Sequence, residues 1–205
     1  MNRWLGIAIV TVGVAVAALG TWYVMHARPK LGALIDTIPA DRGQRVVVSH
    51  EADGPNSFVS LMEGDREVWE AYVPAYGGRP GAPGIAVGKT CVSIRIIRDG
   101  KAEIFALARN DSQKLGGMGL GHGHGPVDPD AKGPVTLTDH ERSYEVVSGP
   151  DWHQLVAFDL TSGKPLWSVE LGVDPVTDGG VEGHRVWIAQ GQNRHSFEGL
   201  SGKPI

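Results

Sequence analysis

Two histidines in a short glycine-rich stretch are the residues that most clearly suggest a metal-binding site. His122 and His124 alternate with glycines, and Asp128 and Asp130 follow closely. Imidazole nitrogens and carboxylate oxygens bind zinc, copper or nickel, so His122 and His124 are the candidate metal ligands. No third ligand is evident, and ordering so glycine-rich a stretch costs entropy. A solvated loop without metal is therefore the competing interpretation.

Other signs of catalysis or nucleic-acid binding are missing from the sequence. It contains no Gly-x-Ser-x-Gly elbow, phosphate-binding loop or His-Glu-x-x-His pair. The one cysteine, Cys91, lies in an apolar run, which predicts a buried and inert thiol. The net charge of −4 and the lack of a basic stripe exclude nucleic acid as the expected partner. We therefore expect no catalytic residues and no resident cofactor.

Alternating apolar residues around a turn predict an antiparallel hairpin near residues 155–169. Val156 and Phe158 alternate with small or polar neighbours, the period of a half-buried strand. Gly163 provides the positive φ that a tight turn needs. Asp159 is expected to accept hydrogen bonds from this turn rather than to act in catalysis. Such hairpins, with 29 glycines and 13 prolines in the chain, predict an all-β domain.

The hairpin resembles the repeat of quinoprotein-like (PQQ-repeat) β-propellers. Blades of that family often carry an alanine, an aspartate, a Thr/Gly/Lys turn and a tryptophan at similar spacing. The corresponding residues here are Ala157, Asp159, Thr161, Gly163, Lys164 and Trp167. The resemblance implies a quinoprotein-like β-propeller, or a partial propeller, in which these residues have structural roles. Chance hairpins in an ordinary antiparallel sandwich are the alternative.

A second copy of the motif supports the propeller interpretation. Residues 197–205 repeat residues 158–166, and the repeated turn contains Gly202 and Lys203. The copy ends one position before the tryptophan. We therefore expect an incomplete propeller, either a fragment of a longer product or a half that pairs with a second copy of the chain.

Two fainter copies complete a set of about four blades. One places Trp69 at the position of Trp167, and the other has Gly116 there. The copies recur at about the spacing that four-stranded blades require, roughly 40–50 residues. Strand-like runs that we expect to open the repeats lie at 44–50, 90–97, 143–148 and 185–190, with hairpin partners at 58–62, 103–108, 154–160 and 195–198. Long loops are expected at 75–83 and 116–134.

The N-terminus predicts a membrane anchor. Residues 4–25 contain no charged side chain, and a helix of that length would be about 33 Å long, enough to cross a bilayer. A cleaved signal peptide is the alternative, but no good cleavage site follows the run. The predicted organisation is an anchor at 1–27, a linker at 28–43 and a propeller-like domain at 44–205.

The resemblance also bears on compartment and function. Positive charges flanking the anchor slightly favour a cytoplasmic C-terminal side, whereas quinoprotein-like propellers usually work outside the cytoplasm. We expect a single-pass membrane protein with a periplasmic domain. The resemblance extends to the non-catalytic lipoprotein of outer-membrane protein assembly, which implies a scaffold that binds protein partners. The alternative is a fragment or remnant of a pyrroloquinoline quinone (PQQ)-dependent oxidoreductase, with PQQ or a divalent metal as cofactor.

Overall fold

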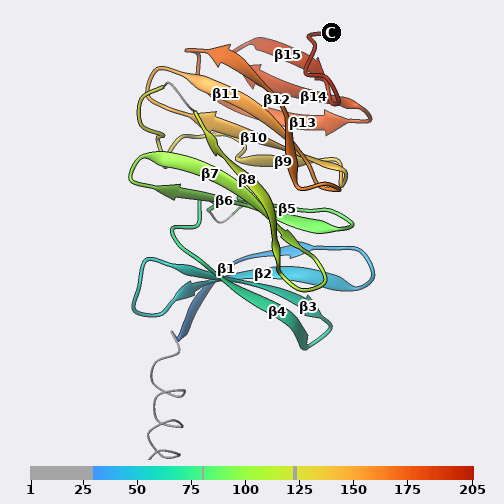
Figure 1. The fold of residues 1–205 in the computed structure, drawn as a ribbon. Coiled ribbons are helices and arrows are strands. Elements are labelled where there is room, and N and C mark those ends of the chain that lie inside the picture. Colours follow the sequence, from blue (N-terminus) through green and yellow to red (C-terminus); the bar gives the residue numbers. More distant parts are fainter. Residues whose placement is uncertain (1–29, 80, 122–123) are drawn as a thin grey trace, which may run out of the picture.

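Four antiparallel sheets, stacked face to face, make up the part of the chain described by the computed structural model, residues 30–79, 81–121 and 124–205 (Figure 1). The strands of the first two sheets are β1 (Leu31–Pro39), β2 (Gln44–Glu51), β3 (Ser57–Glu63), β4 (Arg66–Val73), β5 (Ile85–Val87), β6 (Cys91–Arg98), β7 (Lys101–Ala108) and β8 (Lys114–Leu120). Those of the last two are β9 (Thr136–Thr138), β10 (Arg142–Ser148), β11 (His153–Asp159), β12 (Lys164–Gly172), β13 (Val176–Glu182), β14 (Arg185–Gln190) and β15 (Asn193–Glu198).

Each sheet is a meander in which consecutive strands are hydrogen-bonded neighbours. The first three sheets have four strands in the orders β1-β2-β3-β4, β5-β6-β7-β8 and β9-β10-β11-β12. The fourth has the order β13-β14-β15, and Pro204 forms an isolated bridge to Phe197. Four-stranded meanders stacked in sequence order are the blades of a propeller, so we refer to the sheets as blades one to four.

Burial follows the position of a blade in the stack. In the two middle blades β6, β10 and β11 are buried along nearly their whole length, because a neighbouring blade covers each of their faces. In β2 and β14 buried residues alternate with less buried ones. Three apolar clusters fill the three seams between the blades, and apolar burial of this kind is the main stabilising term.

The predicted strands are present, but they do not open their repeats. Strands β2, β6, β10 and β14 match the four expected runs and are the second strands of their blades. The opening strands were missed because β5 and β9 have three residues each, too few for a periodic pattern, and β13 contains two adjacent glycines. The predicted hairpin partners correspond to β3, β7, β11 and β15.

Two segments predicted as linker or loop are strands. Residues 31–39, assigned to the predicted linker at 28–43, form β1, which pairs with β2 from Leu31 to Pro39. The predicted loop at 116–134 begins inside β8, whose three glycines hid its strand character. The predicted anchor at 4–25 lies outside the described residues. Within the described ranges no helix has the length and apolarity needed to span a bilayer.

A β-bulge recurs at the same place in the first three blades. It follows the pairs Leu61–Trp69, Ala106–Gly116 and Ala157–Trp167, each joining the third strand to the fourth. Gly116 therefore does occupy the tryptophan position of blade two, as the repeat predicts. The backbone of blade three comes close to it there, since a Cβ on Gly116 would collide with the Gly163 carbonyl oxygen.

This close approach predicts that Gly116→Ala destabilises the protein. Overpacking of this kind costs about 1–3 kcal/mol in unfolding free energy, which urea denaturation of the full chain in detergent would measure. Ser168→Ala, on the exposed fourth strand of blade three, is the control and should change stability by no more than about 0.5 kcal/mol. Equal stability of both variants would show that the seam can widen at Gly116.

Candidate functional site

One backbone carbonyl recurs at the three seams, directly after the third strand of a blade. The residues that carry it are Arg109, Leu160 and Gly199. Their N–H groups donate to the first turn of their own blade, at Thr90, Glu141 and His184, over 2.7–2.8 Å. A buried carbonyl needs a hydrogen-bond partner, and in each case the preceding blade supplies one. We call this contact the seam latch.

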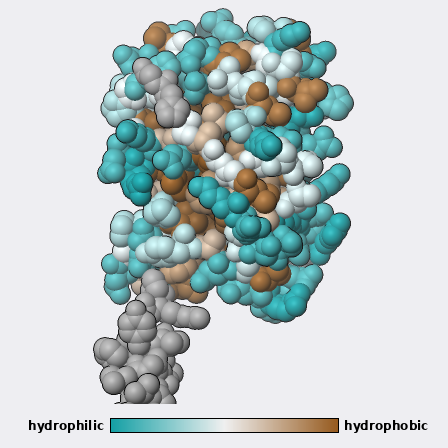
Figure 2. Space-filling view, viewed as in Figure 1, coloured by the Kyte–Doolittle hydropathy of each residue, from teal (hydrophilic) through white to brown (hydrophobic). Residues whose placement is uncertain are grey.

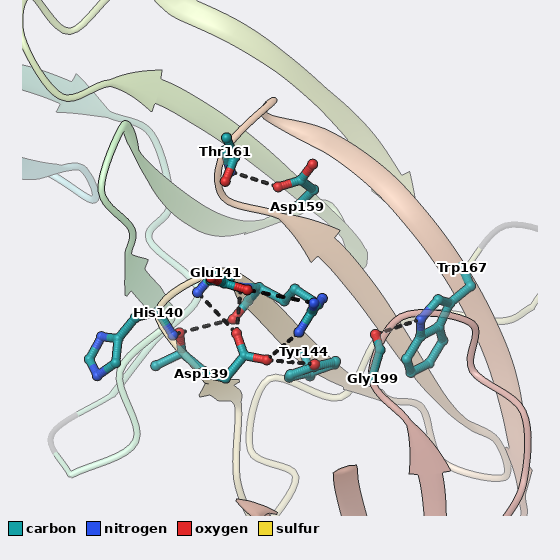
Figure 3. A network of polar contacts seen from close by, with 10 residues as sticks. Asp139, His140, Glu141, Tyr144, Asp159, Thr161, Trp167 and Gly199 are labelled. Atoms are coloured by element: carbon teal, nitrogen blue, oxygen red, sulfur yellow. Dashed lines mark hydrogen bonds and ion pairs between the residues drawn. The ribbon is translucent and has the colours of Figure 1, made fainter. Parts of the chain in front are cut away.

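Tryptophan forms the seam latch at the first and third seams. The indole of Trp69 donates to the Arg109 carbonyl over 2.9 Å, and the indole of Trp167 donates to the Gly199 carbonyl over 3.0 Å (Figure 3). Trp69 is 7% exposed, whereas Trp167 is half-buried beneath the turn that holds Gly202. A Cβ on Gly202 would lie 2.6 Å from the indole ring. The two tryptophans thus fill equivalent places between blades.

The middle seam replaces the tryptophan with two smaller donors. At Gly116 the backbone of blade three lies so close that an indole has no room. The Leu160 carbonyl instead accepts from the Thr90 hydroxyl at 2.9 Å and the Cys91 thiol at 3.0 Å. Burial, and to a smaller extent the nearby Asp159 carboxylate, raises the pKa of Cys91 to about 12. The thiol is thus buried and protonated at neutral pH, as the sequence predicts.

The remaining repeat residues lie in or next to the turns that present these carbonyls. Asp159 accepts from the Thr161 N–H at 2.7 Å (Figure 3). It also accepts from the Ser162 hydroxyl at 2.7 Å. Burial alone would raise the pKa of Asp159, but these hydrogen bonds outweigh it and lower the pKa. Gly163 and Gly202 have positive φ (70° and 69°). Ala157 is fully buried, and Lys164 and Lys203 are exposed.

A recess opens at the turns of the first seam, next to the seam latch. It has a volume of about 430 Å³ and is lined by Arg42, Gln44, Lys89, Thr90, Arg109 and Asn110. Arg42 and Lys89 are exposed, and no acidic residue is among the lining. The recess therefore suits an anionic group, and it is our candidate functional site.

Arg109 forms the rigid base of this recess. Its guanidinium donates to the Gly88 carbonyl at 2.9 Å and to the Gln44 side chain at 2.6 Å, and it forms an ion pair with Asp41. The hydrogen bond from Arg109 lowers the pKa of the Asp41 carboxyl, which stays ionised. Arg109 is thus neutralised by Asp41, and the Arg42 Nε lies 3.8 Å from the same carboxylate. One carboxylate cannot neutralise two guanidiniums and Lys89, so the recess keeps a net positive charge for a ligand. Sequence reasoning missed the site because its residues come from three separate turns. The local signal was a single basic residue in each turn: Arg42, Lys89 and Arg109.

The predicted metal ligands are placed only in part. His124 stacks on Trp152 with 4.7 Å between ring centroids, and its Nε2 lies 3.2 Å from the Glu170 carboxylate. His122 lies outside the described residues. Among the residues that are described, no group of three or more histidine, cysteine, aspartate or glutamate side chains could hold a metal. Metal binding at His122 and His124 stays a prediction.

A further histidine, His153 at the start of β11, has the surroundings of a core residue. It is 6% exposed, and burial lowers its pKa.

Two charged side chains are buried in the middle seam. Arg95 of β6 is 4% exposed and Glu145 of β10 is 1% exposed. They lie on the strand faces that Ser93 and Ser143 bring together, with 3.4 Å between the two hydroxyl oxygens. Burial raises the pKa of Glu145 to about 7, although attraction to Arg95 and a hydrogen bond from Thr136 oppose the shift.

Comparison with solved structures identifies the architecture. BamB from Moraxella catarrhalis superposes with a TM-score of 0.55 at 13% identity, over 84% of this chain and 49% of its own. The quinohemoprotein alcohol dehydrogenase from Comamonas testosteroni gives 0.60 at 12% identity, over 86% of this chain and 35% of its own. The chain adopts a β-propeller fold. It spans about half or less of the length of these structures, and at such low identity the likeness extends to the fold alone.

Comparison of the amino-acid sequence identifies no family and no relative. No protein-family model matches the sequence, and no curated protein is detectably similar to it. The four-blade architecture, predicted from the repeats, is confirmed by the described residues.

The seam latch predicts that Trp69→Ala is strongly destabilising. Removing a buried indole costs about 3–5 kcal/mol, because it leaves a cavity and an unpaired carbonyl on Arg109. Trp69→Phe keeps most of the packing and should cost about 1–2 kcal/mol for the lost hydrogen bond. Urea denaturation would measure both values. Trp187→Ala is the control: this half-buried indole stacks on Arg194, and its loss should cost about 1 kcal/mol or less.

The raised pKa of Glu145 predicts a pH-dependent stability. The carboxyl is protonated in both states below pH 4.5, and as pH rises towards about 7 the unfolded state ionises first. Stability is therefore lost over this window, by roughly 3 kcal/mol. Glu145→Gln should remove this slope in urea denaturation at pH 4.5, 6 and 7.5. The exposed Glu67→Gln should keep it, and an unchanged slope in Glu145→Gln would contradict the assignment.

Proposed function

We propose that this chain is a membrane-anchored, extracytoplasmic β-propeller that acts as a non-catalytic interaction module. The observation that carries the proposal is the basic recess of about 430 Å³ at the turns of the first seam. Propeller turns are the positions where a rigid scaffold presents variable side chains to partners. The partner that fits is a protein with an exposed acidic segment.

The rigidity of the recess supports a binding role. Arg109 is held by Asp41, Gln44 and the Gly88 carbonyl, so the base of the recess is formed before any ligand arrives. Arg42 and Lys89 stand at its exposed rim. A preformed site loses less conformational freedom on binding, which raises affinity, and rim charges accelerate association with an acidic partner.

The sequence supports the remaining parts of the proposal. The uncharged run at residues 4–25 has the length of a membrane-spanning helix. The resemblance to the lipoprotein of outer-membrane protein assembly favours a periplasmic scaffold. A second copy of the chain is the alternative partner. The likeness in fold to a quinohemoprotein dehydrogenase keeps the remnant of a PQQ-dependent oxidoreductase as the alternative function.

A binding assay with a defined acidic probe tests the recess. The full chain in detergent should bind a fluorescent ten-residue polyglutamate peptide in anisotropy measurements. The Arg42→Glu/Lys89→Glu double variant should bind it at least about tenfold more weakly, since two attractions become repulsions. Arg185→Glu/Arg194→Glu changes the charge equally on exposed residues of blade four and should bind like the parent. If both double variants bind the peptide equally weakly, the effect depends on net charge alone and not on the recess.

The oxidoreductase alternative has its own assay. The chain is incubated with PQQ and calcium, desalted, and examined for the absorbance of bound cofactor. The interaction module predicts a protein fraction free of cofactor, and stoichiometric retention of PQQ would favour the alternative.

A further inference from the structure

A narrow cavity lies where the two long interblade loops meet the middle seam. Residues 74–84 lead from blade one to blade two, and the loop after β8 leads from blade two to blade three. The cavity between them has a volume of about 10 Å³. That is the space that one water molecule or one monatomic ion requires.

Basic side chains dominate the lining of this cavity. Arg79, Arg95 and Lys132 contribute positive charge, and Asp128 is the one acidic residue among the lining. The Arg79 Nη2 donates to the Gly133 carbonyl over 2.9 Å, so this guanidinium is tied to the loop that closes the cavity. The charges around the cavity therefore sum to a positive value.

Arg95 is buried there without a complete set of partners. Its Nη1 donates to the Val146 carbonyl over 2.7 Å, but its buried Nε has no hydrogen-bond partner among the residues that the structure describes. Glu145 attracts it, but within the described residues no carboxylate comes within the 4.0 Å of an ion pair. A buried charge without a close counter-charge is costly, and the proximity of Arg79 adds repulsion.

We propose that this cavity is a binding site for a monatomic anion of the size of chloride, held between Arg79 and Arg95. A water molecule could accept a hydrogen bond from the Arg95 Nε, but it would not offset the repulsion between the two guanidiniums. A carboxylate or phosphate would not fit the volume. The ion would tie both interblade loops to the middle seam, the one seam without a tryptophan latch. The inference is independent of the proposed interaction with an acidic partner.

Thermal unfolding of the full chain in detergent tests the site. At constant ionic strength, replacing sodium gluconate by sodium chloride should raise the melting temperature saturably, by about 2–4 °C, because gluconate is too large to enter. Arg79→Gln should abolish this difference. Arg185→Gln, an exposed change on blade four, should keep it. Equal melting temperatures of the parent chain in both salts would overturn the proposal.

A direct measurement keeps the proposal testable if Arg79→Gln fails to fold. Crystals of the parent chain grown in sodium bromide should show an anomalous peak between Arg79 and Arg95. A site filled by water, with no anomalous signal there, would overturn the assignment.

Discussion

The need to satisfy one backbone carbonyl at each of the three seams governs how the stack is held together. The carbonyls of Arg109, Leu160 and Gly199 lie at the seams in buried residues, and the preceding blade supplies the donor. Apolar packing brings the sheets together but allows them to slide, because it has little directionality. The latch adds a directional bond, and it thereby sets the position of one blade on the next. At the two outer seams a β-bulge lies next to the tryptophan that donates this bond.

The donor groups of the seam latch differ between the outer seams and the middle seam, so the three seams are not equivalent. The outer seams place an indole under a turn, so their polar contact is combined with a large apolar area. The middle seam has a hydroxyl and a thiol instead, and it buries Arg95 and Glu145 nearby. All three seams depend on apolar packing, and the stability of the middle seam depends in addition on the protonation of Glu145. Figure 2 shows one face of the stack, with hydrophobic side chains in its middle, smaller hydrophobic groups toward the C-terminal end and hydrophilic side chains along both sides.

The sequence predicted those parts of the fold that depend on neighbouring residues. The alternation in β2, β6, β10 and β14 is a local pattern, and the turn with Asp159 and Gly163 is formed within a few positions. The tryptophan repeat also singled out Trp69 and Trp167, which the structure places at the first and third seams. The short β5 and β9 are held by the strands beside them rather than by a pattern of their own, so they were missed. The recess joins Gln44 to Arg109 across a seam, and no periodicity in either segment indicates that contact.

The seam latch also gives the stack a polarity. In every seam latch the earlier blade donates and the later blade accepts, so the latch contact distinguishes the two faces of a blade. Head-to-tail contacts of this kind are heterologous. If a blade were turned over, its donor would face the donor of its neighbour, and the latch hydrogen bond could not form. A blade can therefore be inserted, duplicated or exchanged only in one orientation. Tandem duplication of a blade preserves this orientation. The order of the blades therefore stays defined even where glycine occupies the tryptophan position, as it does at the middle seam.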